Sequence, residues 1–276
     1  MNSPIGIFDS GVGGLTVLRE IRRLMPNEPI IYVGDTARAP YGGKDEETLR
    51  SYGRDIIRFF LERNVKAVVM ACGTSSSTSF EQLSAEFPNL PMVDTIRPGV
   101  KAAEELIKAK PETRLGFIAT EATVKNGLFE RLLLKKCPGV TFHARACPMF
   151  APMTEAGLAG IPNHPLPIFA AKNYLADLRG QIDALVLGCT HYPLLTDALI
   201  HALGDVTFIN PAIATAQAAK DLLAKSNILC DNDVSWGENS NATVEYCTSG
   251  STEAFCRNAS AILNEDCTPI KITFTR

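Results

Sequence analysis

The chain has 276 residues, of which 46% are hydrophobic and 21% are charged, and its formal net charge is −3 with a pI near 5.9. These values are typical of a globular protein and exclude a disordered or collagen-like chain. The slightly negative charge also argues against a nucleic-acid partner, because nucleic-acid-binding surfaces are normally strongly basic.

Short apolar runs alternate with amphipathic helical patterns along the whole chain. The runs are rich in isoleucine and valine and do not alternate in polarity, which is typical of parallel strands buried on both faces. We expect strands at 5–8, 30–33, 67–71, 92–94, 115–119, 140–145, 184–187, 206–209, 243–247 and 270–274. Helices are predicted at 15–25, 46–62, 97–109, 166–179, 194–203, 212–224 and 252–263. The alternation predicts an α/β fold with parallel sheets and right-handed crossovers.

Membrane and secretory features are missing from the sequence. No apolar run approaches the roughly 18 residues that a membrane-spanning helix needs. The first residues carry no basic region of a secretory signal. We therefore expect a cytoplasmic protein with no membrane contact, whose eight cysteines are reduced thiols. No C-x-x-C pair is present, so neither a zinc site nor a thioredoxin-type redox site is predicted.

A weak internal repeat relates two parts of the chain. Residues 65–72 align without gaps on residues 182–189, and the two segments end in Cys72 and Cys189. Residues 5–10 align on residues 115–120 at a similar offset. Two matches at similar offsets predict two similar α/β domains with parallel sheets.

Four polar clusters follow predicted strands, at the strand ends where open α/β sheets bind their ligands. They are residues 9–14, 35–44, 72–77 and 188–193. The glycines of the first cluster do not have the G-x-G-x-x-G spacing of a dinucleotide site. That cluster fits a tight strand-to-helix turn, or a loop whose backbone N–H groups face a small carboxylate.

The two repeat cysteines are candidate acid–base groups. Each ends a strand and precedes a predicted helix start, where the helix dipole lowers the pKa of a thiol. A thiolate on one face could remove a proton from a carbon acid while a thiol on the opposite face returns one, which inverts the stereocentre. The competing interpretation is that both are inert buried cysteines.

His191 and Asp9, which also follow predicted strands, are candidates to assist the two thiols. His191 could poise Cys189, donate to a substrate carboxylate, or form a Cys–His nucleophilic pair. Asp9 could assist Cys72 in the same way, or cap the following helix. No fourth ligand accompanies Cys72, Cys189 and His191, so we expect no metal.

Taken together, the four clusters closely resemble the glutamate racemase family, within the aspartate/glutamate racemase superfamily. The shared motifs are GIFDSGVGGLTVLREI (6–21), YVGDTARAPYGGK (32–44), ACGTSSS (71–77), IATEATVKNG (118–127), LGCTHYPLL (187–195) and YCTSGSTEAF (246–255). The resemblance implies racemisation of L- and D-glutamate for peptidoglycan synthesis, without a cofactor such as pyridoxal phosphate, and a possible homodimer. It also implies two α/β domains, 1–95 plus 208–276 and 96–207, with the active site in the cleft between them.

The resemblance carries roles over residue by residue. Cys72 and Cys189 match the two acid–base thiols, and Asp9 and His191 match the groups that assist them. Glu155 matches an acid that orients the histidine. Substrate contacts are implied for Asp9, Ser10, Pro40, Tyr41, Gly42, Gly73, Thr74, Thr120, Thr123, Thr190 and His191.

Gly73 departs from the family pattern, which has asparagine after the first cysteine. An asparagine would contact the polar head of the substrate, whereas glycine offers only its backbone N–H, so the preference for glutamate is open. A racemase of aspartate or another small amino acid is therefore an alternative. A non-catalytic amino-acid-binding protein and a Cys–His acyl-transfer enzyme are two further alternatives.

Overall fold

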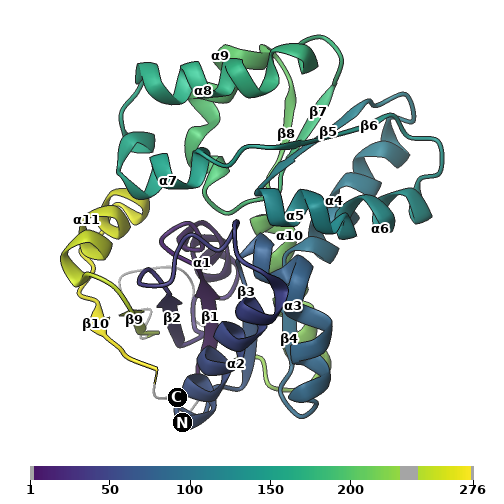
Figure 1. Ribbon diagram of the computed structural model, residues 1–276. Coiled ribbons are helices and arrows are strands. Elements are labelled where there is room, and N and C mark those ends of the chain that lie inside the picture. The colour runs from purple at the N-terminus through teal and green to yellow at the C-terminus, as the bar shows by residue number, and fades with distance from the viewer. Residues whose placement is uncertain (1–2, 231–241, 275–276) are drawn as a thin grey trace.

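The computed structural model describes residues 3–230 and 242–274, which form two parallel sheets (Figure 1). Within these ranges the first sheet has the order β10-β9-β2-β1-β3-β4, and the second has the order β6-β5-β7-β8. The strands are β1 (Ile5–Asp9), β2 (Ile30–Gly34), β3 (Ala67–Met70), β4 (Met92–Asp94), β5 (Leu115–Ala119), β6 (Phe142–Ala146), β7 (Ala184–Leu187), β8 (Thr207–Ile209), β9 (Val244–Thr248) and β10 (Ile270–Lys271). All neighbouring strands pair in parallel, which confirms the predicted fold class.

The two sheets repeat one strand order. The series β2-β1-β3-β4 in the first sheet corresponds to β6-β5-β7-β8 in the second, so β1 is equivalent to β5 and β3 to β7. These are the strands that the sequence repeat pairs. Cys72 and Cys189 follow β3 and β7, and they therefore lie at equivalent strand ends of the two sheets.

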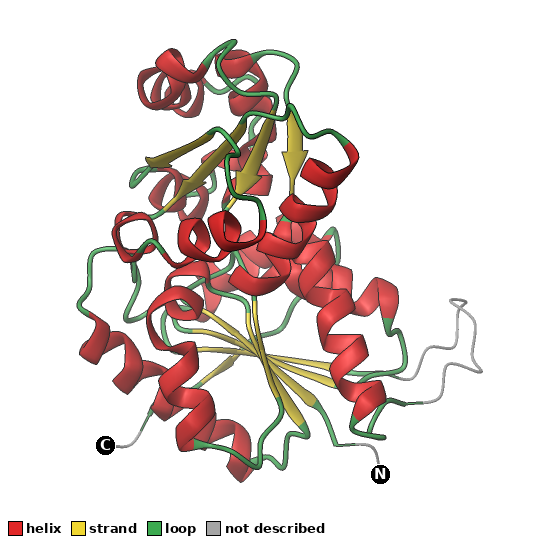
Figure 2. Cartoon of the chain, turned by 90° about the vertical axis from the view of Figure 1, so that its right-hand side faces the viewer, coloured by secondary structure: helices red, strands yellow, loops and turns green. Residues whose placement is uncertain are grey.

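Helices cover both faces of each sheet (Figure 2). The helices are α1 (Leu15–Leu24), α2 (Glu46–Glu62), α3 (Gly73–Glu86), α4 (Ile96–Ala109), α5 (Glu121–Asn126), α6 (Leu128–Lys136), α7 (Phe150–Glu155), α8 (Pro165–Leu175), α9 (Thr196–Leu203), α10 (Pro211–Lys225) and α11 (Thr252–Leu263). Short 3-10 helices span Leu158–Gly160, Ala176–Leu178 and Tyr192–Leu195. Apolar side chains of α1, α10 and α11 form one core of the first sheet, and those of α2 and α3 form the other. Among the described residues, no helix is long and apolar enough to cross a membrane.

Local sequence explains the predicted helices, as α2 illustrates. Its N-cap is Asp45, whose carboxylate accepts a hydrogen bond from the Thr48 N–H at 2.8 Å. Leu49, Ile56 and Phe60 recur at helical spacing and are fully buried against the sheet.

The sequence predicts the start of a helix after Cys72 but not the extent of α3, because this helix has no apolar stripe. Its first turns are mostly serine and threonine, and these side chains are buried. Their hydroxyls donate to backbone carbonyls instead of water: Ser76 to Met70 at 2.9 Å, and Ser77 and Thr78 to Thr74 at 3.0 and 2.8 Å. The short helices α5, α6 and α7 are also missing from the prediction.

Edge strands depart from the predicted burial on both faces. The central strands β1, β2, β3, β5 and β7 are buried throughout, as predicted. In contrast β6 is only partly buried and both residues of β10 are exposed. Each lies at the edge of its sheet, where one side has no neighbouring strand.

The chain crosses between the two sheets twice. Thr95 joins β4 to α4, and Asn210 joins β8 to α10. The crossings are side by side, because α4 packs on α10 and the Thr215 hydroxyl donates to the Thr95 hydroxyl at 3.1 Å. We propose that the sheets mark two domains and that the second boundary follows β8, since a boundary at residue 208 would divide that strand.

Candidate active site

A cavity of about 220 Å³ lies between the two sheets and is lined by both candidate thiols. Cys72 is 5% exposed and Cys189 is 8% exposed. The other predicted contacts that line the cavity are Ser10, Pro40, Tyr41, Gly42, Gly73, Thr74, Thr120, Thr190 and His191. Asp9, Thr123 and Glu155 do not line it. Residues that follow strands of both sheets line it, so it has the position expected of a ligand site between two domains.

Several lining residues are missing from the sequence prediction. They are Gly43, Glu121, Pro148, Ala151 and Pro152. Gly43 and Glu121 are chain neighbours of predicted contacts. The other three belong to the segment before and within α7, where the sequence analysis assigns only Glu155 to the site.

Cys72 occupies the N-cap of α3 with an extended backbone conformation. The pKa of its thiol is raised to about 11, mainly by burial and also by the nearby Asp9 carboxylate, against a hydrogen bond from the Ser75 amide. The expected lowering of this pKa by the helix dipole is therefore wrong. Desolvation of the thiolate outweighs the helix terminus, so Cys72 is protonated at neutral pH.

A hydrogen-bonded chain runs from Cys189 through His191 to Glu155. The Cys189 Sγ lies 3.6 Å from the His191 Nδ1, and the His191 Nε2 lies 2.7 Å from the Glu155 Oε1. Burial lowers the pKa of His191, but Cys189 and Glu155 together raise it well above 6.5. The imidazole is therefore protonated at neutral pH beside the thiol.

Asp9 is fully buried next to the first thiol. Its carboxylate accepts hydrogen bonds from the Gly11 N–H at 3.1 Å and from the Thr190 hydroxyl, across the cleft, at 3.2 Å. Burial raises the pKa of Asp9, although the His191 charge opposes this. The alternative role as a helix cap is wrong, because the N-cap of α1 is Gly14.

The glycine-rich turn after β1 receives side chains from the second sheet. A Cβ atom on Gly11 would lie 1.9 Å from the Glu155 Oε1, and one on Gly13 would lie 2.5 Å from the His191 Nδ1. The Val12 N–H donates to the Glu155 Oε1 at 2.8 Å. The sequence predicts that these N–H groups face a small carboxylate. In the structure one of them, the Val12 N–H, binds the carboxylate of Glu155.

Asp35 fixes the loop that carries Tyr41 and Gly42. Its fully buried carboxylate accepts hydrogen bonds from the Tyr41 hydroxyl, from the Arg38 Nε at 2.6 Å and from the Ser249 hydroxyl at 2.6 Å. The sequence gives no indication of this network, because Ser249 is 214 positions away in the chain.

We expect Asp35→Asn to lower the free energy of unfolding by about 3 kcal/mol, because the buried Tyr41 and Ser249 donors and the partly buried Arg38 lose a charged acceptor. Urea unfolding would measure this. The control is Asp55→Asn, since Asp55 pairs with the same guanidinium at 2.7 Å but is 24% exposed, and its loss should cost under about 1 kcal/mol. Equal losses in the two variants would contradict the assignment.

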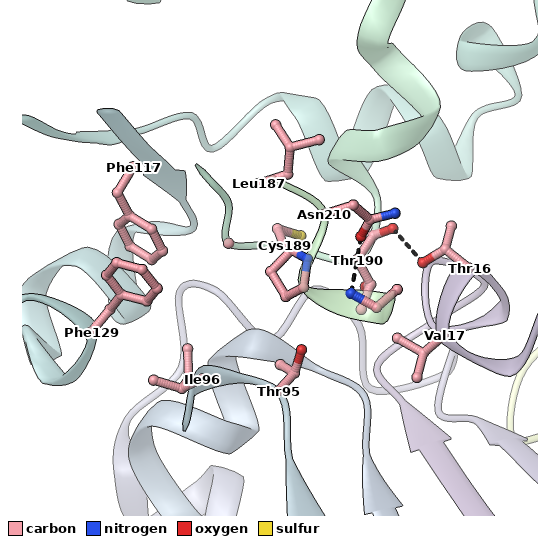
Figure 3. A pocket seen from close by; sticks show the side chains of 13 residues that line it. Thr16, Val17, Thr95, Ile96, Phe117, Phe129, Leu187, Cys189, Thr190 and Asn210 are labelled. Atoms are coloured by element: carbon pink, nitrogen blue, oxygen red, sulfur yellow. Dashed lines mark hydrogen bonds between the residues drawn. The ribbon is translucent and has the colours of Figure 1, made fainter. Parts of the chain in front are cut away.

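A second cavity, of about 10 Å³, also touches Cys189 and Thr190 (Figure 3). Figure 3 shows the Thr16 hydroxyl donating to the Thr190 carbonyl, at 3.1 Å. A space of this volume holds at most about one water molecule. The 220 Å³ cavity, which both thiols line, is therefore the candidate active site.

Thr74 and Thr120 also connect the two sheets across the cleft. Their hydroxyls are 2.9 Å apart, and the Thr120 hydroxyl is 2.9 Å from that of Thr123. The site thus offers two thiols, each with a polar neighbour, and several hydroxyls. This arrangement suits proton transfer to and from two sides of a small polar ligand.

Comparison with known proteins gives one consistent family. A family model described as Asp/Glu/Hydantoin racemase matches residues 5–219. A glutamate racemase from Aquifex aeolicus is 42% identical over 219 residues, which cover 79% of this chain and 83% of that protein. The structure of a glutamate racemase isoform from Bacillus anthracis matches with a TM-score of 0.87 at 34% identity, covering 98% of this chain and 97% of that chain. A Francisella tularensis glutamate racemase in complex with D-glutamate matches with a TM-score of 0.86 at 29% identity, covering 99% and 98%.

Proposed function

Because this chain belongs to the Asp/Glu/hydantoin racemase family, we propose a two-thiol mechanism for its racemisation of glutamate. The observation that supports this mechanism is that Cys72 and Cys189, at equivalent strand ends of two sheets, line one cavity. The enzyme is an isomerase with a small-molecule substrate, and the mechanism requires no cofactor.

Glutamate lies between the two thiols in this mechanism. A thiolate on one side takes the α-proton, which leaves a planar carbanion, and the thiol on the other side gives its proton to the opposite face. One proton is taken and one is given, so the two cysteines exchange their protonation states in each turnover. Backbone N–H groups at the start of α3 and the hydroxyls of Thr74 and Thr190 stabilise the substrate carboxylates.

The ionisable residues beside each thiol assist its proton transfer. The raised pKa of Asp9 lets this carboxyl group take up a proton near Cys72. Glu155 holds His191 in its protonated form, and this imidazolium lies beside Cys189. Cys72 is a thiol at neutral pH and is poised to donate. The two thiols therefore have different ionisable neighbours, a carboxyl group beside Cys72 and an imidazolium beside Cys189.

The cellular role follows from the same resemblance. We propose that the enzyme works in the cytoplasm, that its D-glutamate supplies peptidoglycan synthesis, and that it forms a homodimer. The dimer can be tested by sedimentation equilibrium.

Exchange of the α-proton with solvent D₂O tests the mechanism. We expect deuterium incorporation with inversion from both L- and D-glutamate, without added cofactor, as measured by NMR and chiral chromatography. Exchange with aspartate but not with glutamate would assign a different substrate. Tight glutamate binding without exchange would indicate a binding protein, and a covalent acyl adduct on Cys189 would indicate acyl transfer.

A further inference from the structure

Thr16 connects the two sheets through its side-chain hydroxyl. It lies in the first turn of α1 and is 1% exposed. The hydroxyl contacts two carbonyl oxygens, that of Gly13 at 2.8 Å and that of Thr190 at 3.1 Å (Figure 3). Gly13 belongs to the turn after β1, whereas Thr190 follows β7 of the second sheet. The second contact therefore links the first sheet to the segment that carries Cys189.

The carbonyl group of Thr190 is part of the peptide group that joins this residue to His191. A peptide group is planar, so a contact that fixes its oxygen fixes the orientation of the whole group. Cys189 precedes this peptide group and the imidazole of His191 follows it, with the Cys189 Sγ 3.6 Å from the His191 Nδ1. The contact with Thr16 thus bears on the thiol and on its ionisable neighbour together.

Side chains of the same segment also contact the first sheet. The Thr190 hydroxyl donates to the Asp9 carboxylate at 3.2 Å, and a Cβ atom on Gly13 would lie 2.5 Å from the His191 Nδ1. Both contacts involve side chains, which can rotate about their own bonds when the backbone shifts. The contact from Thr16 differs from them because it holds the backbone itself.

A valine at residue 16 would keep the shape of the side chain but remove this contact. A methyl group in place of the hydroxyl would lie 3.1 Å from the Thr190 carbonyl oxygen, whereas carbon and oxygen atoms prefer about 3.5 Å. The Thr190 carbonyl must then retreat by a few tenths of an ångström. Serine, in contrast, retains the hydroxyl and can donate as threonine does.

We propose that Thr16 is a positioning residue for racemisation, whose hydroxyl fixes the backbone between Cys189 and His191 and so directs the Cys189 thiol into the cavity that Cys72 also lines. The inference rests on the proposed two-thiol mechanism, because the placement of Cys189 matters to the rate only if this thiol transfers a proton. A misplacement of about 1 Å between reacting groups can cost about 100-fold in rate, so the smaller shift in Thr16→Val should cost about 10-fold.

The test compares Thr16→Val and Thr16→Ser with the wild-type enzyme. The control is Thr113→Val, since Thr113 is also buried and its hydroxyl donates to the Lys110 carbonyl at 2.7 Å, outside the cavity. Two quantities are measured: kcat and KM for glutamate, and the rates at which iodoacetamide alkylates Cys72 and Cys189, resolved by peptide mass spectrometry.

We expect Thr16→Val to lower kcat by about 10-fold with a smaller change in KM, and Thr16→Ser to retain most of the wild-type kcat. Alkylation of Cys189 in Thr16→Val should become severalfold faster, because its loop is no longer held, whereas that of Cys72 stays at the wild-type rate. Thr113→Val should leave kcat and both alkylation rates unchanged. Urea unfolding should give similar midpoints for the two valine variants, since each loses one buried hydroxyl.

The outcomes separate the role of Thr16 from the racemase mechanism. Faster alkylation of Cys189 alone in Thr16→Val, with a wild-type enzyme that does not racemise glutamate, would support the contact while the proposed function fails. Wild-type kcat and alkylation rates in Thr16→Val would overturn the inference. Equal acceleration at both thiols would also overturn it, because the substitution would then loosen the whole fold. A loss of kcat in Thr16→Ser as large as in Thr16→Val would do the same, since the methyl group and not the hydroxyl would be the essential part.

Discussion

Cys72→Ala and Cys189→Ala should each lower the rate of glutamate racemisation by about 10⁴-fold, because each removes one of two proton-transferring groups. Both thiols line the same cavity, and no other thiol among the described residues lines it. Chiral chromatography of the reaction measures the loss. Cys247→Ala is the control, since Cys247 is also a buried thiol near the end of a strand in the first sheet, outside the cavity.

The two variants should also differ in a complementary way. Each retains one thiol, which can reach the α-proton of only one enantiomer. In D₂O, Cys72→Ala should exchange the proton of one enantiomer without inversion, and Cys189→Ala should exchange that of the other. NMR with each pure enantiomer would show this. Exchange of the same enantiomer in both variants, or full racemisation by either, would contradict the mechanism.

Glu155→Gln should lower kcat/KM by about 100-fold at neutral pH and shift its pH profile. Glu155 is one of the groups that raise the pKa of His191, so a neutral glutamine lets this pKa fall toward 6.5. The imidazolium is then lost at lower pH, and the alkaline limb of the profile moves down. NMR titration of His191 would measure the shift directly. Asp197→Asn is the control, because it alters a surface carboxylate 4.0 Å from His201.

The ion pair of Glu155 and His191 makes a pH-dependent contribution to stability. The pKa of Glu155 is lowered: burial raises it, but the hydrogen bond from His191 outweighs burial. Its contribution is present above pH 4.5 and is lost as pH falls through the lowered value. The pKa of His191 is raised, so its contribution is present below pH 6.5 and is lost as pH rises through the raised value. The difference in unfolding free energy between the wild type and Glu155→Gln should therefore be largest between these two pH values.

Much of the fold follows from the sequence, because its strands are short apolar runs that local patterns define. The repeat also predicts that Cys72 and Cys189 occupy equivalent strand ends. The helix α3 has no apolar period, since its buried hydroxyls bond to its own backbone or to that of β3. Helix prediction from hydrophobic spacing cannot detect such a segment.

The site depends on contacts between distant parts of the chain, and these are less predictable. The pKa of Cys72 depends on burial under groups from both sheets, which outweighs the local helix terminus. The sequence identifies the turn at Gly11 and Gly13, but only the structure places Glu155 and His191 against it. The structural role of Asp35 likewise depends on its hydrogen bond with Ser249, which is distant in the sequence.

The shared strand order of the two sheets bears on how one enzyme accepts two mirror-image substrates. In the proposed mechanism the carbanion is planar and achiral, and the thiols at equivalent strand ends of the two sheets face its opposite sides. The polar neighbours of the two thiols differ: Asp9 lies near Cys72, whereas His191, paired with Glu155, lies beside Cys189. The two enantiomers have equal free energy, so kcat/KM must be the same in both directions for every variant. The difference between the two sides of the site can therefore change kcat and KM for L- and D-glutamate only by the same factor.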